Sequence, residues 1–334
     1  MAGVIGTGSI PRLLQDGVGQ VFGNSLEEHE TKYDKMFKVL SSTKNFEINV
    51  QLEGFSRSSD KSEGDDITFD SRRQGFTPKY QHSTLAKGFI VTEEALEDEL
   101  YGQLDEGAQA LARSMMIGKE LDGANVFNNG FDATVIMIDG DGAELFNTAH
   151  SNGPSGGTYS NRLAVDADLT EAALEDALAI VQTMDDARGL PAALQARRLI
   201  VAAGTNSFNA QRILGSVLQN DTGNNATNAI RDMNSVRDGW MSNPYLTDTD
   251  AWFLTTDAPS GLKYYTRRKV RFGQDNAFTS GNARFKADER YSFGWDDARG
   301  AIGSQGPCSG VSAPLLLTVN NLVSIGPKGH RSRT

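Results

Sequence analysis

NFEINVQLEGFSRSSDKSEGDDITFDSRRQGFTPKYQHSTLAKGFIVT, residues 45–92, is the stretch that decides the fold. It begins as a strand in which apolar and polar residues alternate, so that successive side chains point to opposite faces. The apolar face consists of Phe46, Ile48, Val50 and Leu52, and the polar face consists of Glu47, Asn49, Gln51 and Glu53. The segment that follows is charged and almost free of core-forming side chains, and the chain then returns through LAKGFIVT, residues 85–92.

This stretch, called the ribbon below, has little of its own to pack against. Two-stranded ribbons are only marginally stable alone in water. We therefore expect the ribbon to lie on a neighbouring subunit, which indicates a protein that assembles rather than a solitary enzyme. Glycines at positions 54, 64, 75 and 88 are expected to act as hinges that let the ribbon change its angle.

The ribbon carries acidic and basic side chains in balance. One interpretation is a solvated loop without a partner. The interpretation that we favour is a set of ion pairs between subunits, because such pairs set register and specificity more than affinity. The candidate contact residues are Arg57, Asp60, Lys61, Glu63, Asp65, Asp66, Asp70, Arg72 and Arg73.

The chain of 334 residues is acidic, with a net charge of −11. Residues 307–334 run against this trend, since they contain basic side chains and no acidic ones. An acidic surface argues against sequence-specific binding of nucleic acid, which requires a basic footprint. It fits a protein that lies near nucleic acid without adhering tightly to it, because like charges repel each other.

The single cysteine, Cys308, excludes an internal disulfide and suggests a reducing compartment. The N-terminal sequence lacks the basic start and the long apolar run of a secretory signal. The longest apolar cluster, residues 314–325, is interrupted by Asn320 and Asn321 and is too short to span a bilayer. No membrane partner is therefore expected.

The longest helical pattern lies at residues 93–127, where apolar residues recur every three or four positions and form one stripe. Several glycines within it suggest bending or close packing. A second helix is predicted at residues 169–187. The inward-facing residues are Leu96, Leu100, Leu104, Ala108, Leu111 and Met115 in the first helix, and Leu174, Ala177, Leu178 and Val181 in the second.

The remaining elements are shorter, and their order shows no regular alternation of strand and helix, which indicates an α+β fold. We predict an extended arm at residues 1–24, a helix at 25–41 and a helix at 208–218. Residues 219–240 are rich in Asn, Asp and Gly and are interpreted as a surface loop. Strands are predicted at 134–138, 198–203, 252–255, 262–266, 270–272 and 284–294, the last continuing toward residue 302.

The sequence contains no recognisable constellation for catalysis, cofactor binding or metal binding. Its four histidines, His29, His82, His150 and His330, lie far apart and lack metal-ligand spacing. The glycine patterns of phosphate and dinucleotide sites are absent, and so is a nucleophile elbow. His150, in the string LFNTAHSN, has the chemistry of a catalytic base, but we interpret it as a hydrogen-bonding loop residue. We predict no catalytic residue, cofactor or metal.

The order of these parts resembles the Hong Kong 97-type major capsid protein of tailed bacteriophages, and within that fold the major head subunit of Mu-type phages. The resemblance spans about residues 20–306. The strings that carry it are LFNTAHS (145–151), TEAALEDALAIVQTMDDARGLP (170–191), RRLIVAAGTNSFNAQRILGS (197–216) and NSVRDGWMSNPYLTDTDAWFLTTD (234–257).

The resemblance implies a layout of parts and a mode of assembly. Subunits would form pentamers and hexamers that close an icosahedral shell around double-stranded DNA, and the loop at the capsomer axis would carry Asn220, Asn224, Asn225, Asn228 and Arg231. The implied parts are an N-terminal arm (1–44), an extended E-loop (45–92), a peripheral P-domain with the long spine helix (93–165), an axial A-domain (166–280), a P-domain return strand (281–306) and a C-terminal extension (307–334).

The resemblance also implies partners and a location. The chain begins almost at the arm, so a separate scaffold protein is implied, together with a portal and room for a decoration protein. The subunit would be assembled in the host bacterial cytoplasm and end in the virion capsid. Three alternatives remain at this stage: an encapsulin-like protein cage of the same fold, a soluble hydrolase or binding protein with an Asn/Gly-rich site loop, and a tail or connector protein.

Overall fold

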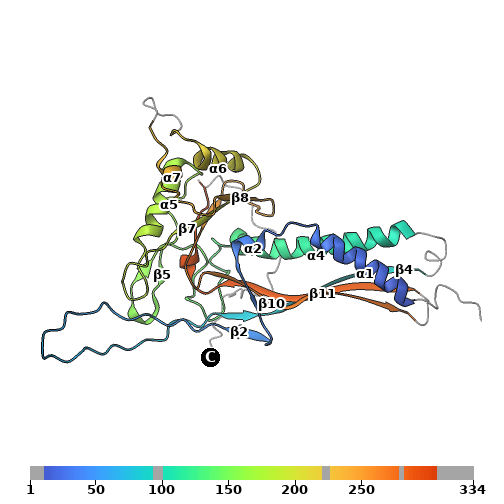
Figure 1. Ribbon diagram of the computed structural model, residues 1–334, viewed down its shortest axis with the longest axis horizontal. Helices are drawn as coiled ribbons and strands as arrows, with labels where there is room; N and C mark the ends of the chain where they lie inside the picture. Colours follow the sequence, from blue (N-terminus) through green and yellow to red (C-terminus); the bar gives the residue numbers. More distant parts are fainter. Residues whose placement is uncertain (1–10, 93–100, 220–225, 278–281, 307–334) are drawn as a thin grey trace, which may run out of the picture.

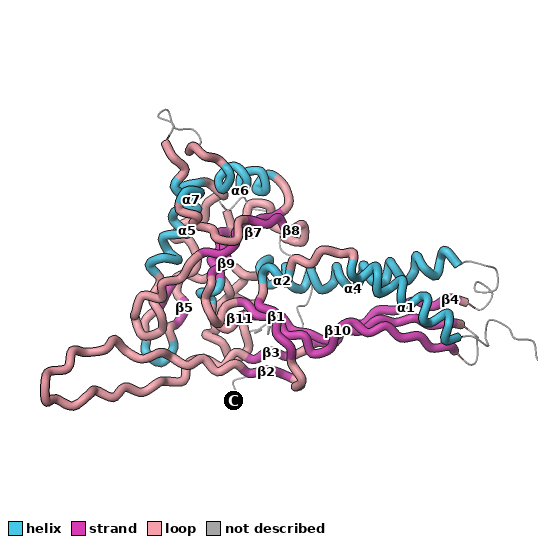
Figure 2. The backbone as a smooth tube through the Cα atoms, viewed as in Figure 1, coloured by secondary structure: helices cyan, strands magenta, loops and turns pink. Residues whose placement is uncertain are grey.

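The computed structural model describes residues 11–92, 101–219, 226–277 and 282–306. Figure 1 shows a compact mixed α/β part, a long extension of helices and strands on one side of it, and a loop that projects on the other side. We call the compact part the body and the long extension the arm. Figure 2 shows that the strands of the arm run alongside its helices.

The arm consists of a four-stranded sheet and two helices. Its strands, in spatial order, are β1 (Lys38–Ser41), β10 (Leu262–Asn276), β11 (Ala283–Trp295) and β4 (Ser83–Val91). β11 is antiparallel to both β10 and β4, and β1 is parallel to β10. The helix α4 (Tyr101–Asn128) packs against the sheet, and α1 (Pro11–Glu27) packs against α4.

The predicted helical stripe accounts for the packing of α4. Leu104, Ala108, Leu111 and Met115 are buried in one cluster with side chains of α1 and β11, as expected. Leu96 and Leu100 lie outside the described residues. Burial of this kind removes apolar surface from water, and each large side chain that is buried stabilises the folded state by about 1.5–3 kcal/mol.

The glycines of α4 allow close packing at two points. A Cβ atom on Gly107 would lie 3.1 Å from the ring of Phe89, and one on Gly123 would lie 3.3 Å from the ring of Phe293. A Cβ atom on Gly118 would meet no atom within 4 Å. Close approach to aromatic rings of the sheet therefore explains Gly107 and Gly123, but not Gly118.

The predicted N-terminal elements were wrong. Instead of an extended arm at 1–24 and a helix at 25–41, the described residues form α1, the short helix α2 (Tyr33–Met36) and the strand β1. Val18 and Phe22, four residues apart, are buried against α4, which stabilises a helix where the glycines suggested none. Residues 38–41 pair with β10, so tertiary pairing overrides the helical spacing there.

The body is a four-stranded sheet with helices beside it. Its strands, in spatial order, are β12 (Ala301–Ser304), β9 (Trp252–Thr256), β7 (Ala196–Ala202) and β8 (Trp240–Asn243). The helices are α5 (Glu171–Thr183), α6 (Thr205–Gly215) and α7 (Ala229–Asp232).

The predicted inward face of α5 is confirmed. Its four predicted residues, Leu174, Ala177, Leu178 and Val181, are buried, and the Thr170 hydroxyl caps the helix by accepting from the Ala173 amide. The helix ends at Thr183 rather than near 187, because Met184 is extended and its carbonyl accepts from the Ala192 amide at 2.9 Å.

Three strand predictions need correction. Residues 134–138 are irregular, and the Val135 amide closes a turn onto the Asp132 carbonyl at 2.9 Å. The strands predicted at 262–266 and 270–272 are one strand, β10. The strand predicted to continue toward 302 is interrupted by the 3-10 helix η3 (Ala298–Gly300), after which β12 joins the body.

Two strands lie in a different sheet from the one that the predicted domain limits would suggest. β10 lies in the sheet of the arm although it falls within residues 166–280, and β12 lies in the sheet of the body although it falls within 281–306. One hydrophobic cluster, which includes Phe127 of α4 and Phe253 of β9, joins arm and body. The domain limits drawn from the sequence stay predictions.

Candidate assembly surface

The ribbon leaves the molecule as a pair of extended segments. At its base, β2 (Phe46–Ile48) pairs antiparallel with β3 (Lys79–Gln81), and a single bridge joins Leu52 to Gln74. Residues 54–73, called the tip below, are all exposed, and Figure 1 shows them projecting beyond the body. The tip thus finds no burial on its own chain, as expected from its composition.

All nine candidate contact residues lie in the tip and are exposed: Arg57, Asp60, Lys61, Glu63, Asp65, Asp66, Asp70, Arg72 and Arg73. Asp70 and Arg72 make polar contacts next to the base, where the Arg72 Nε donates to the Glu53 carbonyl at 3.3 Å. No ion pair joins the side chains of residues 57–66 to another described residue. Their role in contacts between subunits stays a prediction.

Asp70 is held by the opposite side of the ribbon. Its carboxylate accepts from the backbone amide and the hydroxyl of Ser56, both at 2.7 Å, and from the Ser71 amide at 2.7 Å. These hydrogen bonds to the charged form lower the pKa of Asp70 from 3.8 to about 2, and Arg188 adds a smaller effect. The carboxylate therefore stays ionised and ties the two sides of the tip together.

Arg188, a residue of the body that the sequence did not point to, binds both sides of the ribbon. It lies in the turn after α5 and donates to the Gly54 carbonyl at 3.1 Å and to the Ser71 carbonyl at 2.6 Å. It also pairs with the carboxylates of Glu53, at 3.5 Å, and Asp70, at 3.7 Å. One guanidinium with several donors can bridge four groups in this way.

Glu53 is the buried end of this contact. Only 4% of the residue is exposed, and its carboxylate accepts from the Ser155 amide at 3.1 Å and from the Ser155 hydroxyl at 2.5 Å. Ser155 belongs to the 3-10 helix η2 (Gly153–Ser155), which joins β5 (His150–Ser151) to β6 (Thr158–Tyr159). The ribbon base is therefore fixed from two separate segments of the body.

The alternation predicted for residues 46–53 is confirmed, and its polar side faces the molecule. Phe46, Ile48, Val50 and Leu52, called the outer face below, are 40%, 47%, 50% and 52% exposed. The four polar residues between and after them are less exposed and contact the chain itself. A cavity of about 730 Å³ opens between the ribbon base and the body. It is lined by polar residues such as Glu53, Lys263 and Asp296 and also by apolar residues, which include Ile48, Val50 and Leu52.

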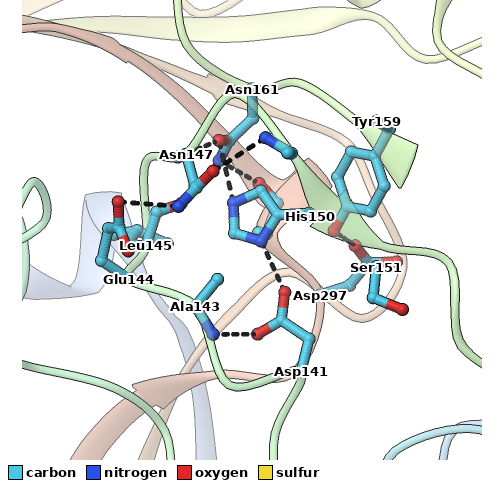
Figure 3. A network of polar contacts seen from close by, with 12 residues as sticks. Asp141, Ala143, Glu144, Leu145, Asn147, His150, Ser151, Tyr159, Asn161 and Asp297 are labelled. Atoms are coloured by element: carbon cyan, nitrogen blue, oxygen red, sulfur yellow. Dashed lines mark hydrogen bonds and ion pairs between the residues drawn. The ribbon is translucent and has the colours of Figure 1, made fainter. Parts of the chain in front are cut away.

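His150 is a structural residue, as interpreted from the sequence. It is fully buried, and Figure 3 shows both ring nitrogens engaged: Nδ1 lies 2.5 Å from Asp141 Oδ2, and Nε2 lies 3.1 Å from Asn161 Oδ1. Tyr159 stacks on the ring at a centroid distance of 5.1 Å and donates its hydroxyl to Asp297. Within the described residues, no group of three or more His, Cys, Asp or Glu side chains could hold a metal ion.

The predicted axis-loop residues divide into three groups. Asn220, Asn224 and Asn225 lie outside the described residues. Asn228 was expected at the surface, but it is buried, with 1% of the residue exposed. Its Nδ2 donates to the Ile213 carbonyl at 2.6 Å, and its Oδ1 caps α7 by accepting from the Arg231 amide. Arg231 is exposed, and its place at a capsomer axis stays a prediction.

The sequence model of the phage capsid protein family matches residues 76–304, more than half of the chain. The chain belongs to this family. No curated protein matches the sequence. Among the described residues, no helix is long and apolar enough to cross a bilayer.

Solved structures confirm the fold of this phage capsid protein. It is similar to the structure of Mycobacterium phage Patience, with 14% identity, a TM-score of 0.52 and coverage of 92% of this chain and 91% of that chain. It is also similar to a virus-like particle from Pyrococcus furiosus, with 10% identity, a TM-score of 0.50 and coverage of 87% of this chain and 99% of that chain. The capsid of a native GTA particle is similar with 11% identity, a TM-score of 0.50 and coverage of 82% of this chain and 90% of that chain. The fold is of the Hong Kong 97 type, as the sequence predicted.

Proposed function

We propose that this capsid protein closes an icosahedral shell from pentamers and hexamers of itself, and that the ribbon is its main contact between subunits. The observation that carries the proposal is the tip, residues 54–73, in which every residue is exposed in the single chain although the base of the ribbon is firmly held. A long uncovered ribbon is a liability for an isolated protein, and natural proteins cover such edges. A neighbouring copy supplies that cover in a shell.

The physical basis of such a shell is the sum of many weak contacts. Each exposed ion pair contributes little, about 0–1 kcal/mol. A closed lattice repeats every contact around each subunit, and multivalency makes the assembly far stronger than any pair of subunits. The charged tip residues, Arg57 to Arg73, then fix the register between neighbours while the repetition supplies the strength.

We further propose the layout and partners that the family resemblance implies. Residues 1–44 form the N-terminal arm, 45–92 the E-loop, 93–165 the P-domain, 166–280 the A-domain, 281–306 the return strand and 307–334 an extension. The segment at 219–240, which was expected to be a surface loop but contains α7, faces the capsomer axis. Assembly takes place in the host bacterial cytoplasm with a separate scaffold protein and a portal, a decoration protein can bind the finished shell, and the acidic chain contacts packaged double-stranded DNA only weakly.

Deletion of residues 56–74 tests the proposal. We expect the shortened chain to stay folded and soluble, because the deleted residues contribute no buried side chain. We expect it to form no closed shells in negative-stain electron microscopy under conditions in which the full chain does. Particles of normal size from the deletion variant would show that the ribbon is not a lattice contact.

Purified particles also separate this function from a protein cage of the same fold. A head of a phage encloses a genome, whereas a cage encloses protein cargo. Nuclease-resistant double-stranded DNA inside particles isolated from infected cells supports the proposal, and enzyme cargo without DNA contradicts it. The family match to phage capsid proteins favours the first outcome.

A further inference from the structure

We propose that the outer face of the ribbon base, Phe46, Ile48, Val50 and Leu52, is a preformed docking surface for a second copy of this chain. This inference rests on the proposed function, which states that copies assemble, and adds which part of the base they cover. The outer face is a different surface from the charged residues of the tip, because its side chains are apolar and it lies next to the body.

The first argument is that the strand is mounted with its polar side inward. Asn49 Nδ2 donates to the Tyr265 hydroxyl at 2.9 Å and to Asp296 Oδ1 at 3.0 Å, and Gln51 Nε2 donates to the Asp296 carbonyl. The Glu47 carboxylate accepts from the Ser42 hydroxyl at 2.7 Å. In an isolated protein the same alternation would place the apolar side on the core and the polar side in water.

The second argument is that this orientation is locked. A slip of one residue would turn every side chain of the strand to the other face and would break all of these hydrogen bonds together. Glu53 adds its contacts with Ser155 and Arg188 at the end of the strand, and on the paired strand Tyr80 is 1% exposed and donates to Asp296 Oδ1 at 2.7 Å. The outer face therefore cannot turn inward, and its exposure is built into the fold.

The third argument concerns size and continuity. Alternate residues of a strand lie about 7 Å apart, so the four side chains form one apolar row of roughly 20 Å. The polar cover is slight, with the Lys79 ammonium 4.6 Å from the centre of the Phe46 ring. Three further apolar residues of the tip, Phe55, Ile67 and Phe69, are 56%, 59% and 89% exposed. Apolar patches of this extent on a protein surface mark sites of protein interaction.

The occupant that fits is another copy of the same chain. The chain belongs to a family of capsid proteins, so the macromolecule present at its surface in greatest number is the protein itself. The outer face is continuous with the tip, and a copy that covers the tip is brought up against the outer face. A nucleic-acid partner is disfavoured, because the four side chains of the row are apolar and none of them can neutralise a phosphate.

A pair of double variants tests the surface. Val50→Glu with Leu52→Glu places two charges on the outer face, whereas Val50→Ile with Leu52→Met keeps it apolar at similar volume. Both variants should keep the circular dichroism spectrum and the melting temperature of the unmodified subunit, since both positions are about half exposed. We expect the charged variant to yield at least about tenfold fewer closed shells, and the apolar variant to assemble normally. Normal shell yield from the charged variant would overturn the proposal.

A labelling experiment reads the same surface without disturbing assembly. Val50→Cys is made in a Cys308→Ser background, and its reaction rate with a maleimide is measured in dissociated subunits and in closed shells. Val165→Cys, at a position 80% exposed in the body, reports any general slowing by the shell. We expect the rate at position 50 to fall at least about tenfold relative to that at position 165.

The outcomes separate the two proposals. If the unmodified chain forms no shells under any condition, the proposed function fails and the docking surface fails with it. If shells form and the cysteine at position 50 reacts in them as fast, relative to position 165, as in free subunits, the docking surface alone is overturned.

Discussion

At the scale of single residues, the surroundings of His150 fix the orientation of its ring. The amide of Asn161 is oriented by its Nδ2, which donates to the carbonyls of Leu145, Ala298 and Ala301 at 2.6, 2.9 and 3.0 Å. Asn161 Oδ1 therefore faces His150 Nε2 as an acceptor, and Asp141 faces Nδ1 as another (Figure 3). Each ring nitrogen of the buried histidine thus has a hydrogen-bond partner, Asp141 at Nδ1 and Asn161 at Nε2.

Replacing His150 by leucine tests these hydrogen bonds. The variant has a side chain of similar size but removes the partner of Asp141 Oδ2, and it leaves Asn161 Oδ1 with the Asn147 amide, which donates to it at 3.0 Å. A buried polar group left without its hydrogen-bond partner costs about 1–3 kcal/mol, so we expect the free energy of unfolding in urea to fall by roughly 2–3 kcal/mol. The matched control is His29→Leu, the same substitution at a partly exposed histidine. It should change the free energy of unfolding by less than about 0.5 kcal/mol. Equal effects from the two variants would show that the hydrogen bonds of His150 do not stabilise the fold.

His82 leads to a prediction about pH. It is 5% exposed, with Nδ1 at 2.9 Å from the Ser292 hydroxyl and Nε2 at 3.0 Å from the Ser42 hydroxyl. Burial lowers the pKa of His82 below 6.5, Arg290 and Arg267 lower it further, and Glu47 opposes them. Below pH 6.5 the unfolded chain thus binds a proton that the folded chain does not, so this group makes stability fall as the pH falls.

The measurement compares the native chain with His82→Gln, which can still hydrogen-bond to both hydroxyls. Urea unfolding is followed at about pH 7.5 and pH 5.5, on either side of the ordinary histidine pKa. We expect the native chain to lose more stability on acidification than the variant does, because the other titrating groups are common to both. The same loss in both proteins would show that His82 does not contribute.

At the scale of elements, Arg188 connects the body to the ribbon, and its loss should loosen the ribbon base. Arg188→Ala removes the donors to Gly54 and Ser71 and the cation beside Glu53. Hydrogen exchange should become at least about tenfold faster at the Glu53 and Gly75 amides, which pair with the carbonyls of Arg73 and Gln51. Exchange in the body sheet should stay unchanged.

Arg197→Ala is the matched control for that experiment, because it removes another arginine of the body whose ion pair with Asp238 is largely exposed. It should leave the exchange of the ribbon base as it is. If Arg188→Ala also left the ribbon amides protected, Arg188 would not be a fixing contact, and the remaining contacts of the base, including those of Asn49, Gln51 and Glu53, would be sufficient to hold it.

The elements that could be predicted from sequence are those with a long repeated pattern. The buried residues of α4 and α5 and the alternation of residues 46–53 follow from spacing alone. Spacing does not say which side of a strand faces the molecule, and only the hydrogen bonds of Asn49 and Gln51 decide it. The role of Arg188 had no local signal either, since its partners lie more than a hundred residues away.

At the scale of the whole molecule, the hinges predicted for the ribbon can be sorted by their surroundings. Gly88 is not a hinge, because it lies within β4, and a Cβ atom there would lie 2.4 Å from the Phe285 carbonyl oxygen of the neighbouring strand. Gly64 has φ +89° and forms the turn of the tip. Gly54 and Gly75 remain, and they flank the contacts of Arg188 and Glu53 where the ribbon leaves the body.

This arrangement predicts how the subunit changes when a shell fills with DNA. In the arm, α1 and α4 pack on the four-stranded sheet through one hydrophobic cluster, so the arm should move largely as a unit. The ribbon, in contrast, can rotate about Gly54 and Gly75. A change in the curvature of α4 should centre on Gly118, because Gly107 and Gly123 pack against aromatic rings of the sheet. Cryo-electron microscopy of empty precursors and filled heads measures both angles. The same ribbon and helix geometry in the two states would contradict the prediction, and rotation centred on Gly88 would contradict the assignment of the hinges.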